Sequence, residues 1–495
     1  MKQKQFITWI FLIAMMLSTT SCGSNENASS SDILSEDTTS ETTTGYPYEI
    51  KDFGGYTFKI LNLDEQYGCY IRLDFDEQTG EKLDDAVYNR NRRVEDRLNF
   101  RLEEVILSGG AAWGTGQTSV CNALIQSVMA DDGAYDAAYL PVYFQPSAVT
   151  DGYVMNLLDI PELHVYDEYW DTIINREMTV NDMLFTASGP LHFMTMDQSY
   201  VLLFNQDMMD KNKMEYPYQL VLDGKWTLDK MYEYVTSAVN LNGDESFAIN
   251  PDGSCVYGIA GHLSSPSAML YSADVRFYER DKGGISLTLE SERMYSALEK
   301  IAKICTSADG NIFYNNAGLN DPTGYMSLFS SNRSLFLTCT LKSTLELRNM
   351  EATFGLVPMP KYDEAQEGYY SEVINFTEFL VIPKTQDDTS RAGIILDTLT
   401  WESYQDVLPV YYDITVSQKG LRNEDSIEML KIVRDNRGIE FTDIFSIGDA
   451  VTSKLSTIIS DGTGDTSGAS SIVASGSSIV STKLSEIITT MEENK

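Results

Sequence analysis

The chain contains 495 residues, with 36 Lys and Arg against 73 Asp and Glu, and carries a formal net charge of −37. A hydrophobic fraction of 43% is enough to build a sizeable core, which excludes a chain that is disordered throughout, and the length predicts about two to four domains or one large two-lobed body. The negative charge argues against nucleic acid as the main partner and against broad electrostatic binding to an anionic membrane, because both require a basic footprint.

The N-terminus has the pattern of an export signal. Lys2 and Lys4 precede an apolar run over residues 6–17, and the small residues 18–21 follow it. A basic start, an apolar middle too short to span a membrane comfortably and small residues before a cleavage point are typical of a secretory signal peptide. We therefore predict a signal peptide over residues 1–21.

Cys22 directly follows the small residues, and residues 23–46 are almost all Ser, Thr, Asn, Asp, Glu and Gly. Such a polar segment cannot bury a core and is typical of a flexible tether. The signal and Cys22 resemble the lipobox of bacterial lipoproteins, although that family usually has Leu where this chain has Thr19. The resemblance implies lipidation of Cys22 and a lipid-anchored tether over residues 22–46. Ordinary secretion with an incidental cysteine is the alternative.

The remaining cysteines are widely spaced, and no C-x-x-C pair occurs among them. This spacing indicates neither a zinc site nor a thioredoxin-type motif. Buried free thiols are the favoured interpretation, and one disulfide stays open for an exported protein. The residues concerned are Cys69, Cys121, Cys255, Cys305 and Cys339.

Strand-like and helix-like segments alternate after the tether. Residues 56–62, 100–107 and 136–143 have the short patterns of strands, and residues 84–98 and 120–130 have apolar residues at helical spacing. This order predicts a parallel sheet with helices on both faces.

The rest of the chain mixes the same two patterns. Strands are predicted over residues 192–204, 258–260, 354–358 and 376–383. Helices are predicted over residues 226–239, 291–306, 325–330, 391–400, 403–411, 426–433 and 482–491. The Gly- and Ser-rich segment 461–478 is interpreted as an extended loop before the last helix. No repeat of solenoid length is visible, which argues against a solenoid.

Motifs of several enzyme classes are absent from the sequence. There is no phosphate-cradling Gly-rich loop, no H-E-x-x-H zinc motif and no G-x-S-x-G nucleophile elbow. None of the 3 histidines sits in a recognisable catalytic setting. Two carboxylates can hydrolyse a glycosidic bond, but with 73 acidic residues chance pairs are common. We expect no enzymatic activity and no cofactor, and the sequence leaves open whether a metal ion is bound.

Several short phrases in the body of the chain are similar, in their order and spacing, to those of a known family. They are YDAA at 135–138, GYVMNL at 152–157, VLLFNQD at 201–207, WTLD at 226–229 and FGLVPMP at 354–360. Together they resemble the extracellular solute-binding proteins of ABC importers, in the carbohydrate-binding family 1 that includes maltose-binding protein. The resemblance covers about residues 50–450.

The resemblance implies an α/β, two-lobed periplasmic-binding-protein-like fold of type II, with the ligand cleft between lobes that hinge strands join. Mapped onto this chain, lobe one comprises residues 47–195 plus 384–440, and lobe two comprises residues 196–383 plus 441–495. Closure of the lobes on the ligand would present the loaded state to a membrane permease.

Candidate ligand-binding residues follow from position and chemistry. Ligands of open α/β sheets bind beyond the carboxyl ends of the strands, and sugars stack on aromatic rings and hydrogen-bond to acids, amides and Arg. The candidates are Asp64, Glu65, Tyr67, Trp113, Tyr143, Asp197, Tyr271, Lys342 and Glu378. No catalytic or metal-binding residue is assigned.

The resemblance also implies the partners and the location. The ligand would be a carbohydrate, an oligosaccharide above all, and the protein partner would be the transmembrane subunits of an ABC permease. The lipid anchor would hold a monomer on the outer face of the bacterial cytoplasmic membrane, with no nucleic-acid partner. Two alternatives stay open: a binding protein for peptides, polyamines or other small solutes, and a surface-anchored glycan-degrading enzyme or adhesin.

Overall fold

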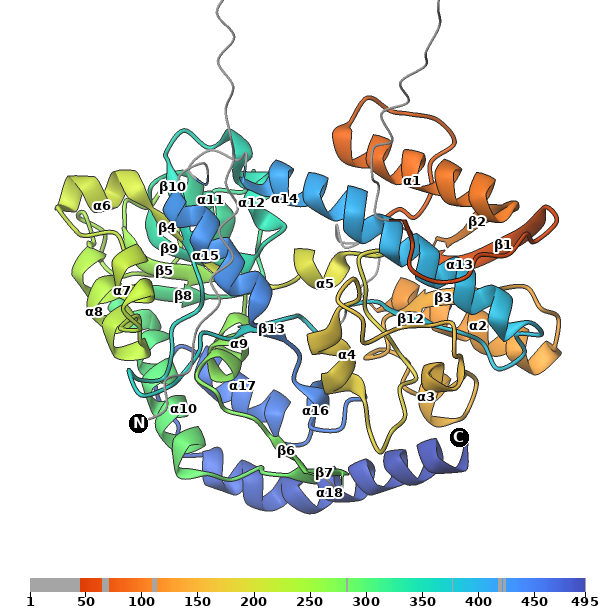
Figure 1. Cartoon of the computed structure of the whole chain (residues 1–495). Helices are drawn as coiled ribbons and strands as arrows, with labels where there is room; N and C mark the ends of the chain where they lie inside the picture. The colour runs from red at the N-terminus through yellow and green to blue at the C-terminus, as the bar shows by residue number, and fades with distance from the viewer. Residues whose placement is uncertain are drawn as a thin grey trace, which may run out of the picture. The chain divides into compact units, whose positions relative to one another are not determined.

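The computed structural model describes residues 45–64, 71–108, 114–281, 284–375, 377–416, 421 and 424–494. The predicted signal peptide and Cys22 therefore lie outside the described residues. Residues from Tyr48 onward belong to one compact unit, in which helices accompany two larger sheets of four and five strands (Figure 1). Within the described ranges, no helix has the length and hydropathy needed to cross a membrane.

The first larger sheet has the strand order β12-β3-β1-β2. Its strands are β1 (Tyr56–Leu63), β2 (Phe100–Leu107), β3 (Ala137–Leu140) and β12 (Phe379–Val381). β1 pairs in parallel with both β2 and β3. The crossover helices α1 (Lys82–Leu98) and α2 (Thr115–Ala130) connect β1 to β2 and β2 to β3. The predicted parallel order is therefore confirmed. β12 comes from far along the chain and pairs antiparallel with β3.

The second larger sheet has the order β10-β4-β9-β5-β8. Its strands are β4 (Tyr200–Asn205), β5 (Tyr257–Gly261), β8 (Asn311–Phe313), β9 (Ser334–Thr340) and β10 (Phe354–Val357). β5 pairs in parallel with β8 and β9, whereas β4 pairs antiparallel with β9 and β10. A hairpin of β6 (Tyr278–Asp281) and β7 (Gly284–Leu287) stands apart from this sheet.

Helices connect the strands of the second sheet. They are α6 (Gln206–Asn212), α7 (Tyr218–Leu222), α8 (Leu228–Ala238), α9 (Ser265–Ser272), α10 (Glu292–Ile304), α11 (Tyr325–Ser330) and α12 (Ser343–Glu346). α8 begins where its sequence predicts, because the Thr227 side chain accepts a hydrogen bond from the Lys230 N–H over 3.2 Å. Its buried residues Leu228, Met231 and Val235 recur at helical spacing and face the core.

The remaining α-helices come between β3 and β4 in the sequence, or follow β12. They are α3 (Ser147–Thr150), α4 (Thr172–Met178), α5 (Met194–Asp197), α13 (Thr389–Glu402), α14 (Leu408–Val416), α15 (Glu424–Asp435), α16 (Phe441–Ile444), α17 (Thr452–Ser460) and α18 (Ala469–Glu493).

Two segments that connect the sheets run side by side. Ser199, between α5 and β4, forms an antiparallel bridge with Val373, and the Ile374 N–H donates to the Gln198 carbonyl over 3.1 Å. The prediction of one strand over residues 192–204 is wrong, because the helical turn α5 precedes β4. An apolar run that is buried on all sides lacks the periodicity that separates a helical turn from a strand.

The C-terminal segment is helical where the sequence suggested a loop. α18 begins at Ala469, so the prediction of an extended loop over residues 461–478 is wrong for most of its length. Val473, Gly476 and Val480 are buried at helical spacing, while the serines between them mask this pattern. Gly476 permits close packing, because a Cβ there would lie 2.5 Å from Val451 Cγ2.

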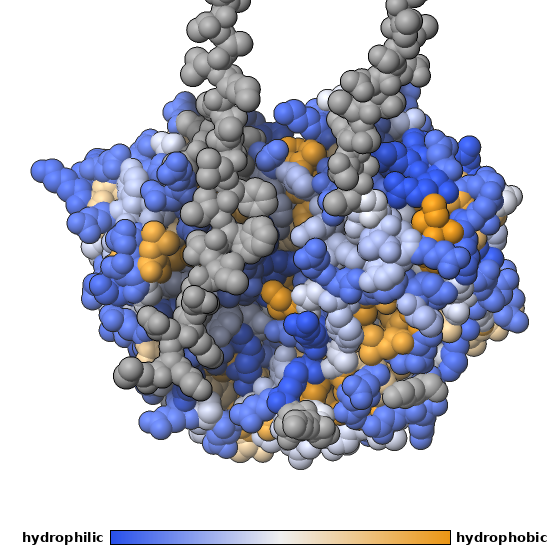
Figure 2. All heavy atoms as spheres, in the orientation of Figure 1, coloured by the Kyte–Doolittle hydropathy of each residue, from blue (hydrophilic) through white to orange (hydrophobic). Residues whose placement is uncertain are grey.

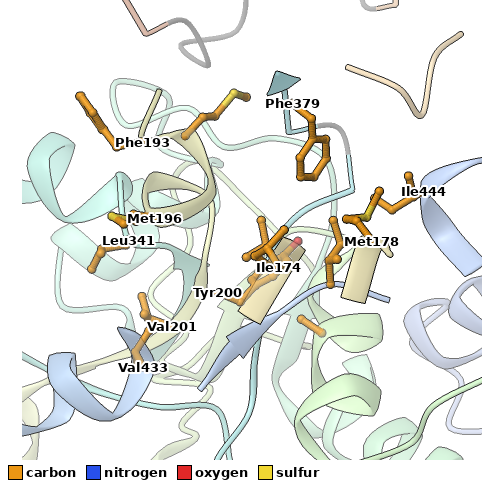
Figure 3. Packing of buried hydrophobic residues seen from close by; sticks show 14 of the residues in the cluster. Ile174, Met178, Phe193, Met196, Tyr200, Val201, Leu341, Phe379, Val433 and Ile444 are labelled. Atoms are coloured by element: carbon orange, nitrogen blue, oxygen red, sulfur yellow. The ribbon is translucent and has the colours of Figure 1, made fainter. Parts of the chain in front are cut away.

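One hydrophobic cluster extends through both larger sheets. Figure 3 shows part of it, in which Met178, Tyr200, Phe379, Val433 and Ile444 are contributed by different elements. Full burial of a side chain of this size contributes about 1.5–3 kcal/mol, so this shared core holds the connecting region together. The outer face in Figure 2 is mostly hydrophilic, with small scattered hydrophobic patches, in keeping with the net charge of −37.

Candidate functional site

A cavity of about 430 Å³ is lined by residues that follow strands of both larger sheets. Tyr143 follows β3 of the first sheet, and His262 follows β5 of the second sheet. Ligands of α/β sheets bind beyond the carboxyl ends of strands. The cavity also falls within the range of about 300–1,000 Å³ that small-molecule sites occupy. Its position and size make it the candidate ligand site.

A short parallel pair of strands brings two acidic residues to this cavity. β11 (Ser371–Glu372) pairs with β13 (Arg437–Gly438), and Glu372 stands opposite Gly438. Glu440 follows two residues later and lines the same cavity as Glu372. The Glu440 carboxylate accepts hydrogen bonds from the N–H of Thr442 over 3.2 Å and from its hydroxyl over 2.8 Å.

Helix α17 presents a row of hydroxyl groups to the cavity. The lining residues on this helix are Thr452, Ser453, Ser456, Thr457 and Ser460, whereas Leu455 and Ile459 are buried in the core. The Thr452 hydroxyl donates to Asp443 over 3.0 Å. These hydroxyl groups can both donate and accept hydrogen bonds, which suits a ligand that carries many hydroxyl groups.

Tyr271 of α9 forms another wall and is only 3% exposed. Its hydroxyl donates to one carboxylate oxygen of Glu177 over 3.2 Å, and the other oxygen accepts the Ile439 N–H over 2.6 Å. The guanidinium carbon of Arg276 lies 3.5 Å from the centre of the Tyr271 ring. Gly438 completes this close arrangement, because a Cβ there would lie 2.0 Å from the Tyr271 hydroxyl oxygen.

The lining of the cavity is rich in acidic residues. Glu372, Glu440, Asp443 and Asp449 all line the cavity, and no Lys or Arg stands among its described lining residues. Burial, followed by the charge of Asp443, raises the pKa of Glu440 to about 8. Burial likewise raises the pKa of Asp443 to about 6. Burial and the charges of Asp443 and Glu440 raise the pKa of Glu372 well above its ordinary range.

His262 does not offset this charge. Burial lowers the pKa of its imidazole, so the neutral form is favoured near pH 7. Its Nδ1 lies 2.7 Å from the Ser264 hydroxyl oxygen, which in turn lies 2.6 Å from the Tyr200 hydroxyl oxygen. The imidazole is therefore part of a neutral hydrogen-bond chain at the edge of the cavity.

The structure brings two of the predicted site residues, Tyr143 and Tyr271, to the same cavity. Glu65, Tyr67 and Trp113 lie outside the described residues. Their role in ligand binding stays a prediction.

The other four candidates do not line this cavity. Asp64 donates its N–H to the Leu107 carbonyl over 3.3 Å. Buried Asp197 accepts a hydrogen bond from Tyr411 over 2.7 Å, and its carbonyl accepts the N–H of Lys342 over 3.0 Å. Glu378 is buried with an oxygen 3.1 Å from His192 Nε2. The side chains of Asp197 and Glu378 are thus engaged within the protein, whereas these hydrogen bonds of Asp64 and Lys342 are made by their backbone N–H groups.

Sequence reasoning missed the acidic residues and the hydroxyl groups of α17. The hydroxyl pattern is visible in the sequence, since residues 452, 453, 456, 457 and 460 share one helical face opposite Leu455 and Ile459. Glu372 and Glu440 give no such signal, because only the pairing of two very short strands brings them together.

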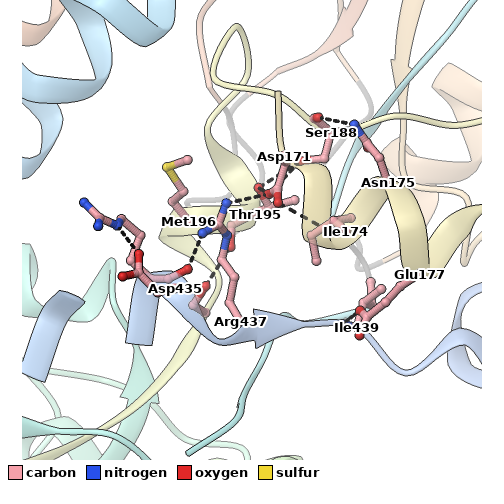
Figure 4. A network of polar contacts seen from close by, with 12 residues as sticks. Asp171, Ile174, Asn175, Glu177, Ser188, Thr195, Met196, Asp435, Arg437 and Ile439 are labelled. Atoms are coloured by element: carbon pink, nitrogen blue, oxygen red, sulfur yellow. Dashed lines mark hydrogen bonds and ion pairs between the residues drawn. The ribbon is translucent and has the colours of Figure 1, made fainter. Parts of the chain in front are cut away.

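A second cavity, of about 400 Å³, lies beside a buried ion pair. Arg437 Nη2 is 2.8 Å from Asp171 Oδ2, and both residues line this cavity. Figure 4 shows the network around the pair, in which Asp171 also accepts hydrogen bonds from Ser188 and Thr195, each over 3.3 Å. The charges of Arg437 and Asp171 are thus paired with each other, and the network connects α4 to β13.

The described residues offer no ready site for a metal ion. No group of three or more His, Cys, Asp or Glu side chains among them is close enough to hold one. Cys121, Cys255, Cys305 and Cys339 are free and buried, as predicted for these thiols.

Solved structures of other proteins resemble this fold, although no sequence comparison finds a relative. No protein-family model matches the sequence, and no curated protein sequence matches it. The structure is similar to the galacto-N-biose and lacto-N-biose I-binding protein of an ABC transporter from Bifidobacterium longum, solved with lacto-N-biose. This match has a TM-score of 0.57 at 12% identity, and it covers 88% of this chain and 99% of that chain.

Two further solved structures are similar. An ABC substrate-binding protein from Listeria monocytogenes in complex with cycloalternan matches at 12% identity and a TM-score of 0.53, over 86% of this chain and 99% of that one. A cyclo/maltodextrin-binding protein complexed with maltotetraose matches at 13% identity and a TM-score of 0.53, over 88% and 96%. The chain described here therefore has the two-lobed α/β fold of the solute-binding proteins of ABC importers.

Proposed function

We propose that this chain is the substrate-binding lipoprotein of an ABC importer and that it captures a carbohydrate, an oligosaccharide above all. The observation that carries the proposal is the cavity of about 430 Å³, whose lining includes residues that follow strands of both larger sheets. The aromatic ring of Tyr143 and the hydroxyl row of α17 suit a polyhydroxylated ligand. The similar solved structures support this ligand class.

Each larger sheet would be the centre of one lobe, with β12 in the first lobe beside β3. The paired segments at Ser199 and Val373 would act as the hinge. A ligand that contacts both lobes favours the closed state, because it gains contacts there that the open state lacks. A permease that recognises only the closed state would then receive loaded protein. This mechanism needs binding and release, with no bond made or broken in the ligand.

The N-terminal segment would place this body outside the cell. Cleavage after residue 21 and lipidation of Cys22 would anchor the chain on the outer face of the cytoplasmic membrane, with residues 22–46 as tether. Substitution of Cys22 by Ser tests this step: the proposal expects the variant in the medium and no incorporation of a labelled fatty acid. A variant that stays with the membrane contradicts it.

Thermal denaturation with a ligand panel tests the function. A ligand at 100 times its Kd adds about 2.7 kcal/mol to the free energy of unfolding when only the folded state binds it. The purified full chain is heated with mono- and oligosaccharides, and with peptides and amino acids for comparison. We expect a higher Tm with one class of glycan, recovered intact. A shift with peptides alone contradicts the carbohydrate assignment, and recovery of cleaved glycan contradicts a role limited to binding.

A further inference from the structure

Glu372 is a buried acid that accepts no hydrogen bond from any residue the structure describes. Its residue is 8% exposed, and its carboxylate lines the cavity. Burial first, and then the charges of Asp443 and Glu440, raise its pKa, while the charge of Arg276 lowers it. Burial of a carboxylate is costly unless a charge or several donors compensate it. Burial raises the pKa of Glu372, so the unliganded chain keeps this acid protonated, and a cationic ligand group placed beside it would stabilise its ionised form.

The neighbouring acids Glu440 and Asp443 have hydrogen-bond partners of their own. Glu440 is held by Thr442 and by the Phe277 N–H at 3.4 Å, and Asp443 is held by Thr452. These donors orient the carboxylates but supply no positive charge. Hydroxyl groups of a neutral sugar would have the same limitation, because they donate hydrogen bonds without cancelling the charge.

The nearest guanidinium, on Arg276, is held behind the wall. It stacks on the Tyr271 ring, and its Nη1 donates to the Tyr271 carbonyl over 2.7 Å. Arg276 attracts Glu440 and Glu372 from there, but it is not one of the lining residues. The face of the cavity that a ligand meets is thus acidic.

We propose that the ligand carries a positively charged nitrogen on a polyhydroxylated frame, as an amino sugar does, and that Glu372 is its counter-ion. An ammonium group supplies three donors and a full charge at once. Tyr143 and the α17 hydroxyl groups contact the sugar frame. The frame rests on the function proposed above, and the charge is the new element. A bound metal ion is a poorer match, because no described group of three ligating side chains converges on one point.

Calorimetric titration of the full chain tests the charge directly. The probes are β-1,4-linked and β-1,3-linked glucosamine disaccharides, their N-acetylated forms and the glucose disaccharides of the same linkages. Spermidine serves as a cation without a sugar frame. We expect one glucosamine disaccharide to bind at least about tenfold more tightly than its neutral counterparts, in the range of a charge-assisted hydrogen bond. Glu372→Gln should remove most of this preference.

Glu299→Gln is the matched control, because it removes the same charge from an exposed position of α10. It should leave the preference unchanged. Glu372→Gln should also raise the Tm of the unliganded chain near pH 7, since it removes an acid that ionises more readily in the unfolded state, and this shift shows that the variant folds.

The outcomes separate the two levels of the proposal. If neutral disaccharides bind as tightly as glucosamine disaccharides, the charge inference is wrong and the carbohydrate function stands. If spermidine binds while every disaccharide fails, the charge inference stands and the carbohydrate function is wrong. A preference for the amine that survives Glu372→Gln overturns the role of Glu372, and binding of none of these probes overturns the inference as a whole.

Discussion

The guanidinium of Arg437 lies 2.8 Å from the carboxylate of Asp171, and both side chains are buried. Asp171 caps α4 by accepting the Ile174 N–H over 3.4 Å, and Arg437 belongs to the strand pair that carries Glu372. The ion pair therefore joins α4 to β13. α4 carries Glu177, which accepts the hydrogen bond from Tyr271 in the wall of the acidic cavity. Stability of the connecting region and geometry of the candidate site depend on the same contact.

Removal of the arginine should destabilise the chain strongly. Arg437→Met leaves the Asp171 carboxylate buried with no charge partner, which costs about 3–5 kcal/mol in comparable cases. Chemical denaturation measures the free energy of unfolding. Lys225→Met is the control, because Lys225 and Asp223 form an exposed ion pair with 3.2 Å between their charged atoms. That variant should unfold like the parent chain, and an equal loss in both variants would contradict this account.

A methyl group at position 438 should disturb the wall of the cavity. The Cβ of Gly438→Ala would lie 2.0 Å from the Tyr271 hydroxyl oxygen and 2.8 Å from the Glu177 carboxylate oxygens. We expect a loss of about 1–3 kcal/mol of stability, as overpacking usually causes, together with weaker ligand binding. Gly468→Ala has open space around the new methyl group and is the control. Unchanged stability and affinity in Gly438→Ala would show that this contact is not needed.

The unliganded chain should lose stability as the pH rises from about 4.5 to about 8. The pKa of Glu440 is about 8 in the folded chain, against an ordinary value of 4.5, because of burial and of the charge of Asp443, which the charge of Arg276 only partly offsets. Below pH 4.5 both states hold the proton, and above it the unfolded state releases the proton first, so the folded state is penalised. The pKa of Asp443, about 6, adds to the lower part of this range.

Glu440→Gln tests this titration. The decrease of Tm between pH 5 and pH 8 should be smaller in the variant than in the parent chain. Glu299→Gln again serves as control and should keep the parent's slope. If the Tm of the parent chain and that of Glu440→Gln changed with pH at the same rate, Glu440 would titrate normally and this prediction would be wrong.

Two neighbouring residues of α18 should differ sharply in their effect. Val480 is fully buried and Ile479 is 55% exposed. Val480→Ala should cost about 1–3 kcal/mol through lost burial and the cavity that it leaves. Ile479→Ala should change the free energy of unfolding by less than about 0.5 kcal/mol. Equal effects, measured by urea denaturation, would mean that α18 does not pack through this face.

The parallel part of the first sheet was predictable because local patterns specify it. β1, α1, β2, α2 and β3 each carry their own periodicity, and the handedness of such units fixes their pairing. Tyr143 followed from its position after the third strand. α18 was hidden, because serine and glycine dominate its exposed face and its buried positions are small.

The acidic half of the candidate site was not predictable from local patterns. Glu372 and Glu440 meet through β11 and β13, each two residues long, which leave no periodicity in the sequence. The chain also has 73 acidic residues, so composition does not single out these two. Tertiary pairing alone distinguishes a buried, unpartnered carboxylate from the many solvated ones.

The central claim is that a carbohydrate binds in the cavity of about 430 Å³ between the two larger sheets. Isothermal titration of the full chain and of Tyr143→Ala with the tightest glycan of the panel tests it most directly. The account predicts one glycan bound per parent chain and an affinity at least about tenfold lower in the variant, since stacking on an aromatic ring contributes substantially to such a site. Equal affinity in the two proteins would place the ligand elsewhere and contradict the account.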